Sequence, residues 1–151
     1  MSQHKGKIAG IVVLLLIIFY AIAVYWSTEP SRFDVVANAK EQAQLRNEKI
    51  VTGYVTTSTL ITVANTLLDK PGGYLSNDVI PPSIIMDDMP AWEYGALEMV
   101  RDLSLSMRKD FSRSQSQSTQ DKDLEIAEPQ LHFDNDSWAV PSTESEYRRG
   151  I

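Results

Sequence analysis

The segment around His132 carries residue types that bind divalent metal ions. His132, Asp134 and Asp136 alternate, and alternate residues of an extended chain point to one side, so an imidazole and two carboxylates would face a single ion. The segment lacks the glycine and the distal glutamate of an EF-hand loop. Three alternating polar residues in a loop are more often simply solvated. We therefore predict no metal and no other cofactor, and His132, Asp134 and Asp136 are the only candidate ligands.

A pair of acidic residues suggests acid–base chemistry on a glycan. Asp87 and Asp88 lie close to Trp92, an aromatic ring on which a sugar could stack. Two adjacent carboxylates cannot act on opposite faces of a glycosidic bond, so catalysis would need a further carboxylate such as Glu93 or Asp134. The alternative is that Asp88 caps a helix and that the aromatic residues belong to the core. We assign no catalytic residue.

Several classes of chemistry are missing from the sequence. The 151 residues contain no cysteine, which excludes disulfides, thiol nucleophiles and cysteine-ligated zinc. No nucleophile-elbow, Walker or dinucleotide-binding motif is present. The net charge is −6, and all 20 acidic residues follow the first apolar run, so the main part of the chain lacks the basic face that nucleic-acid binding requires. We predict that the protein does not bind nucleic acid. Its function is expected to be the binding of another partner rather than catalysis.

The first apolar run predicts a membrane helix. Ile8–Trp26 comprises 19 residues without a charge, and as a helix it would extend about 28 Å, close to the hydrocarbon thickness of a bilayer. Lys5 and Lys7 precede the run and acidic residues follow it, which places residues 1–7 in the cytoplasm and the rest outside. The alternative is a signal peptide cleaved after Ala23, at an A-x-A pattern. The apolar run continues to Trp26, which favours an uncleaved anchor in the lipid bilayer.

Helical segments follow this anchor. Residues 33–49 are rich in helix formers but have a thin apolar face, so we expect a surface helix within a juxtamembrane segment, residues 27–50. Residues 56–68 have helical apolar spacing, with Thr56 or Thr57 as the expected cap. The next helix should begin near Asp88 and continue to about Phe111. Its expected apolar face comprises Trp92, Ala96, Met99, Val100, Leu103 and Met107.

The remaining segments are shorter. Residues 112–123 are polar and of low complexity, which predicts a mobile loop. Residues 124–128 should form a short helical turn. Thr143 and Glu146 have capping-box spacing and should begin a last helix. That helix is only about two turns long before Ile151, and a helix this short rarely holds itself, so we expect the chain to be the N-terminal part of a longer protein.

A long connection, Asp69–Trp92, joins the two central predicted helices. Gly72-Gly73 ends one helix and Pro81-Pro82 imposes an extended stretch. Its many bulky apolar residues are unsuited to a solvated linker, so we expect the loop to pack across the helices as an ordered cap whose exposed parts bind a partner. The candidate partner-binding residues are Tyr74, Leu75, Ile84, Ile85 and Trp92.

Long strings in the chain carry a resemblance. "VTGYVTTSTLITVANTLLDKPGGYLSNDVIPP", "MPAWEYGALEMVRDL", "RKDFSRSQSQS" and "AEPQLHFDNDSW" resemble the bacterial family designated domain of unknown function 2333. The resemblance implies a membrane-anchored envelope protein of Gram-negative bacteria. No activity is assigned to that family, so the resemblance transfers no catalytic residue.

These observations predict a mainly α protein: a single N-terminal transmembrane helix at residues 8–26, followed by a small helical extracytoplasmic domain at residues 51–151 with a long ordered loop. The expected location is the bacterial inner membrane, with the bulk of the chain in the periplasm. The function that the sequence favours is a non-enzymatic binding or scaffold module for an envelope protein or the cell wall. The alternative is a membrane-anchored envelope hydrolase that uses Asp and Glu carboxylates, with or without a metal.

Overall fold

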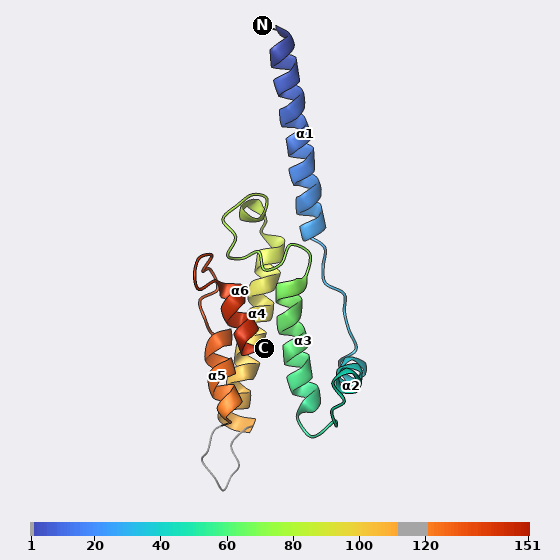
Figure 1. The fold of residues 1–151 in the computed structure, drawn as a ribbon, viewed down its shortest axis with the longest axis vertical. Helices are drawn as coiled ribbons and strands as arrows, with labels where there is room; N and C mark the ends of the chain where they lie inside the picture. Colours follow the sequence, from blue (N-terminus) through green and yellow to red (C-terminus); the bar gives the residue numbers. More distant parts are fainter. Residues whose placement is uncertain (1, 112–120) are drawn as a thin grey trace.

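The computed structural model describes residues 2–111 and 121–151, and these residues are mainly helical (Figure 1). No strand occurs among them, which confirms the mainly α class. The predicted polar loop falls mostly on residues 112–120, outside the described residues. The α-helices are α1 (Ser2–Trp26), α2 (Val35–Arg46), α3 (Tyr54–Asp69), α4 (Asp88–Ser106), α5 (Lys122–Leu131) and α6 (Thr143–Gly150); a 3-10 turn, η1 (Ser83–Ile85), precedes α4, and a π-helical turn, η2 (Met107–Phe111), continues it.

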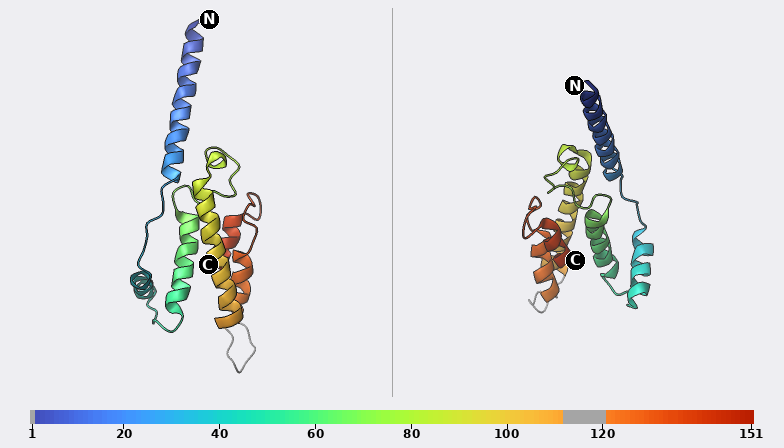
Figure 2. Two further views of the ribbon diagram at one scale, coloured as in Figure 1. Left: turned by 180° about the vertical axis from the view of Figure 1, so that it is seen from behind. Right: turned by 45° about the horizontal axis from the view of Figure 1, so that its top comes forward.

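The first helix, α1, projects away from the other helices (Figures 1 and 2). Its segment Gly6–Trp26 is long and apolar enough to cross a bilayer, and none of its apolar window is buried within the protein. An apolar helix in water would pack against a protein core, so this exposure is typical of a segment that a bilayer surrounds. The helix has the features of a membrane anchor or of a signal sequence.

Four helices, α3 to α6, form the packed part of the domain, and α2 lies against the outer side of α3 (Figure 1). Helix α4 contacts both α3 and α5, and α6 packs on α5. The rings of Tyr74 and Tyr147 meet edge to face, with centroids 5.8 Å apart. The buried core comprises Leu60, Ala64, Leu67, Leu68, Tyr74, Leu97, Val100, Leu131 and Tyr147.

The buried face of α4 overlaps only in part with the apolar face that the sequence predicts. Val100 is buried, and Ala96, Leu103 and Met107 pack partly buried against the core, as predicted. Met99 and Trp92, which belong to the same predicted face, are 64% and 38% exposed. The buried face is displaced by about one residue, or about 100° around the helix. Its members are Met89, Glu93, Leu97, Val100 and Ser104. Apolar periodicity missed this face because two of its members are polar and are buried through hydrogen bonds rather than through apolar contact.

Two predicted helix caps are displaced toward the N-terminus. Helix α3 begins after Gly53, which has a left-handed φ of 90°, so neither Thr56 nor Thr57 is the cap; the hydroxyl of Thr57 donates to the carbonyl of Gly53 (3.2 Å). For α4 the cap is Asp87, whose Oδ1 accepts from the amide of Asp88 (2.9 Å). Such shifts are expected because several neighbouring residues can occupy a cap position.

Helix α5 is longer than the sequence predicts, and α6, which has the predicted length, is stabilised by packing. The expected turn at residues 124–128 is the full helix α5. Helix α6 is capped by Ser142, whose Oγ accepts from the amide of Ser145 (3.3 Å), whereas the predicted cap Thr143 is buried and donates to the carbonyl of Asp134 (2.8 Å). Helix α6 contains the buried core residue Tyr147. Tertiary packing therefore stabilises a helix that is too short to form alone.

Arg101 connects α4 to the end of α5. Its Nε donates to the carbonyl of Leu131 (3.1 Å), and Nη2 donates to the carbonyl of Phe133 (2.7 Å) and to the hydroxyl of Tyr147 (3.2 Å). Burial raises the pKa of the Tyr147 phenol to about 12, although the nearby guanidinium opposes the shift. The phenol therefore stays neutral, and one arginine satisfies carbonyl groups at the end of α5.

A buried ion pair holds the start of the long α3–α4 connection. The ammonium of Lys70, at the end of α3, contacts the carboxylate of Glu93 on α4 and donates to the carbonyl of Gly73; the two side chains are 1% and 0% exposed. The same carboxylate accepts from the amides of Leu75 (2.9 Å) and Ser76 (2.8 Å). Two helices and the intervening backbone therefore share one charged centre, in which hydrogen bonds compensate the desolvation of both ions.

The long connection divides into a buried half and an exposed tip. Tyr74 and Leu75 are 3% and 2% exposed, as an ordered cap requires. Val79, Ile80, Ile84 and Ile85 are 54–79% exposed, so the expectation that the whole loop packs across the helices is wrong for these aliphatic residues. They belong to residues 79–85, hereafter the loop tip, in which Pro82 and Ser83 are buried. The carboxylate of Glu93 holds the first half against the core, whereas the tip extends beyond it.

We expect the two halves of the connection to respond differently to truncation. Leu75→Ala removes a buried side chain and should lower the free energy of unfolding by about 2–5 kcal/mol. Ile85→Ala removes an exposed one and should change it by less than about 0.5 kcal/mol. Urea unfolding in detergent, followed by circular dichroism, measures both. Equal losses for the two variants would show that the tip is packed.

The ion pair gives a second prediction. Glu93→Gln leaves an acceptor for the loop amides but strands the Lys70 ammonium in the core, and should cost about 3–5 kcal/mol. Adding Lys70→Met removes the stranded charge, so the double variant should recover most of the loss. Urea unfolding in detergent measures the stability of both variants. A double variant as unstable as Glu93→Gln would show that the unpaired charge is not the cause.

Candidate functional site

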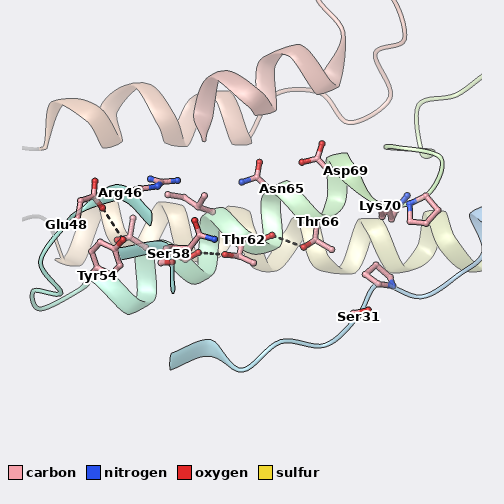
Figure 3. Close-up of a pocket in the computed structure, with 15 residues that line it drawn as sticks. Ser31, Arg46, Glu48, Tyr54, Ser58, Thr62, Asn65, Thr66, Asp69 and Lys70 are labelled. Atoms are coloured by element: carbon pink, nitrogen blue, oxygen red, sulfur yellow. Dashed lines mark hydrogen bonds between the residues drawn. The ribbon is translucent and has the colours of Figure 1, made fainter. Parts of the chain in front are cut away.

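A groove of about 560 Å³ lies along the outer side of α3. Helix α2 and the extended linker that precedes it, including Pro30 and Ser31, form its other wall (Figure 3). A volume of this size accommodates a small ligand or a short extended segment. The groove is partly open to solvent, which suits an extended ligand.

The wall contributed by α3 is a stripe of uncharged polar side chains. Ser58, Thr62, Asn65 and Thr66 are separated by four, three and one residues along α3, so they share one side of the helix. The hydroxyls of Thr62 and Thr66 each donate to a carbonyl one turn earlier (2.8 Å and 2.8 Å; Figure 3). Their donors are thereby used within the helix, and their oxygens can act only as acceptors.

Helix α2 is placed by small residues and by one polar contact. Ala39 and Ala43 are its buried residues, and their small side chains let it approach α3 closely. The side-chain amide of Asn38 donates to the hydroxyl of Thr62 (2.8 Å), which links the two walls of the groove. Asp34 caps the helix by accepting from the amide of Ala37 (2.7 Å). The thin apolar face that the sequence predicts for α2 therefore packs against one side of α3.

Charged residues lie at the two ends of the groove. At one end, Tyr54 donates to the carboxylate of Glu48 (3.0 Å), with Arg46 nearby, and at the other end lies Asp69 (Figure 3). Asp69 pairs with Arg148 of α6 (2.7 Å). Partial burial, together with the hydrogen bond and negative charge of Glu48, raises the pKa of the Tyr54 phenol. The phenol therefore remains a neutral donor at physiological pH.

Asn65 lies between these ends, and its side chain makes no hydrogen bond with any described residue. In Figure 3 its amide points to the same side as Arg46 and Asp69. An asparagine amide can donate and accept at once, as can a peptide bond or a sugar hydroxyl. The lining holds no histidine, and its two carboxylates, Glu48 and Asp69, lie at opposite ends. The arrangement is therefore suited to binding a polar ligand through neutral hydrogen bonds.

The candidate metal ligands do not converge. Among residues 2–111 and 121–151, no group of three or more histidine, aspartate or glutamate side chains is placed to hold a metal ion. Nδ1 of His132 lies 3.0 Å from the carbonyl of Glu128. The carboxylate of Asp134 accepts from the amide of Asp136 (3.5 Å), and interaction with Asp134 raises the pKa of the Asp136 carboxyl.

The acidic pair Asp87 and Asp88 also lies apart from Glu93, which was considered as its catalytic partner. Asp87 and Asp88 are exposed at the start of α4, where Asp87 caps the helix. Glu93 is completely buried and bonded to Lys70 and the loop amides, so no substrate can reach it. Of the candidate partner-binding residues, Tyr74 and Leu75 lie in the core, whereas Ile84, Ile85 and Trp92 are on the surface. The role of these five residues in partner binding stays a prediction.

The groove was not predicted from the sequence. A signal was present: on α3, serine, threonine and asparagine recur at helical spacing opposite the leucines, and no charge interrupts them until Asp69. Such an uncharged stripe is unusual for a solvent-facing helix surface, which typically carries charged residues. The second wall could not be inferred, because the position of α2 beside α3 depends on tertiary contacts.

Comparisons with known proteins give one match. The sequence profile of a bacterial family covers residues 2–151, almost the full chain. Neither a curated protein nor a solved structure matches the chain. The chain belongs to the family described as "Uncharacterized protein conserved in bacteria (DUF2333)".

Proposed function

We propose that the protein is a single-pass inner-membrane protein whose helical domain lies in the periplasm and acts as a non-enzymatic binding module. The groove between α2 and α3 holds an extended segment of an envelope protein or of the cell wall. The observation that carries this proposal is the uncharged, hydrogen-bonding wall of α3 facing an open groove of about 560 Å³.

The composition of the groove supports binding rather than bond cleavage. Ser58, Asn65 and Thr66 present donors and acceptors without charge, while Ile61 and Pro71 add apolar surface. Polar groups with precise positions on a partly apolar surface are typical of ligand sites. An extended peptide or glycan presents regularly spaced amides or hydroxyls that match such a wall.

The charge distribution around α1 supports the proposed orientation. Lys5 and Lys7 precede the apolar segment, and Glu29 and Asp34 follow it. Positive charge stays in the cytoplasm when a helix inserts. The groove would then face the periplasm, where envelope proteins and the cell wall are accessible.

Topology can be tested with fusions. A reporter enzyme that is active only outside the cytoplasm should be active when fused after Asp34, because the positive flank of α1 retains the N-terminus inside. The intact mass of the mature protein should include α1. An inactive reporter after Asp34 would reverse the orientation, and a mature chain that begins at Val24 would mean that α1 is a cleaved signal peptide.

The groove can be tested by photo-crosslinking in native membranes. A photo-reactive phenylalanine at position 65 should form a discrete adduct, because Asn65 faces the groove without an internal hydrogen-bond partner. Position 135 is a matched control, since Asn135 is also half-buried but does not line the groove. Digestion of the adduct with a protease or with a muramidase distinguishes a protein from a cell-wall partner.

The crosslinking result has two contrary outcomes. No adduct from position 65 would show that the groove is unoccupied in the membrane. The same adducts from positions 65 and 135 would show contact without a specific site. Either result would remove the groove from the proposed function.

A further inference from the structure

We propose that the loop tip, residues 79–85, inserts into the lipid–water interface beside α1 and gives the domain a second membrane contact. This inference rests on α1 being a membrane anchor, as in the proposed function, and is independent of what the groove binds. The occupant of the exposed apolar surface is therefore the bilayer that α1 crosses.

The fold places the tip at the membrane end of the domain. The indole of Trp26, the last residue of α1, packs against Gly72 so closely that a Cβ at Gly72 would lie 2.8 Å from its ring. Gly72 also has a left-handed φ of 87°, so glycine is favoured there on both grounds. In all three views the tip reaches the level of the C-terminal end of α1 (Figures 1 and 2). Tryptophan at the end of a membrane helix marks the headgroup region.

The tip has the side chains of a membrane-inserting segment. Val79 and Ile80 are 54% and 60% exposed, and Ile84 and Ile85 are 60% and 79% exposed. No charged residue occurs between Val79 and Met86. A cluster of four exposed aliphatic side chains is costly in water and marks an interaction surface.

The backbone of the tip is also prepared for an apolar environment. Pro81 and Pro82 have no amide hydrogen. The hydroxyl of Ser83 donates to the carbonyl of Ile80 (2.5 Å), and the amide of Ile85 donates to the carbonyl of Pro82 (3.0 Å). Unpaired polar groups oppose entry into lipid, and in this segment several are either absent or internally bonded.

Charges at the base of the tip limit the depth of insertion. Asp78 precedes the tip, and Asp87 and Asp88 follow it, with the last two exposed. Ionised carboxylates stay in water, so the aliphatic side chains enter only the interface and not the bilayer centre. The tip contains no lysine or arginine, so its insertion depends on apolar transfer and does not require anionic lipids.

The absence of cysteine allows a direct test on the full chain. Ile85→Cys, labelled with an environment-sensitive fluorophore and reconstituted into phosphatidylcholine bilayers, should show blue-shifted emission. Lipids that carry a quencher near the headgroups should remove most of this fluorescence, and lipids with a quencher at the bilayer centre should remove less. Ile126→Cys is the matched control, because Ile126 is 61% exposed but lies on α5, away from α1. Its fluorescence should be unaffected by either quencher.

A label at Ile17→Cys, within α1, separates the proposal from the anchor. Quenching at position 17 without quenching at position 85 would overturn tip insertion and leave the anchor intact. No quenching at either position would overturn both. A blue shift at position 85 without lipid quenching would show that protein covers the tip, which also overturns the proposal.

A second set of variants tests whether the aliphatic side chains drive insertion. With the label at position 85, Ile80→Glu combined with Ile84→Glu should abolish lipid quenching, because both substitutions place charge on the tip. Ile126→Glu should leave the quenching unchanged. Undiminished quenching in the double variant would show that apolar transfer does not hold the tip, and would overturn the proposed mechanism.

Discussion

The architecture depends on the buried contact between Lys70 and Glu93. Lysine ends α3, glutamate lies one turn inside α4, and between them the chain makes a connection that a small domain can hardly order by apolar contact alone. A single carboxylate accepts from one ammonium and two backbone amides, so the cost of removing charge from water is offset by several charge-assisted hydrogen bonds. The pair also determines which face of α4 is buried, because Glu93 must face α3.

The ordered half of the connection in turn positions α1 and the C-terminal helices relative to the core. Tyr74 and Leu75 join the core, and Asn77 donates to the carbonyl of Ser137 (3.0 Å) and to Glu144 (3.1 Å), which brings the C-terminal helices to the same end. Trp26 packs against Gly72, so α1 meets the domain at the base of this connection. The proposed membrane contact and the groove then lie on separate surfaces, which allows anchoring and binding to proceed independently.

Neutral hydrogen bonding is the common feature of the groove. The threonine hydroxyls of α3 donate to their own helix, which leaves a surface that is polar but unchanged by pH. Charges are confined to the ends of the groove, where Glu48 and Asp69 each have a partner. Affinity for a ligand would therefore depend on shape and on hydrogen-bond spacing rather than on ionic attraction, which suits selective contact with an extended polymer.

Local features of the sequence determined the helical class, the apolar segment Ile8–Trp26, the positions of α2, α3 and α4, and the family. Helix propensity, the length of an apolar run and long distinctive strings are all properties of neighbouring residues, so they can be read from the sequence. Only the tertiary structure decided the caps, the buried face of α4, the exposure of Ile84 and Ile85, and the groove. Glu93 appears in the sequence as a surface residue, and its burial follows from Lys70, 23 positions away. A pattern of apolar residues does not predict the burial of a polar group whose hydrogen-bond or ionic partner is distant in the sequence. It also does not predict which apolar residues the folded domain leaves exposed.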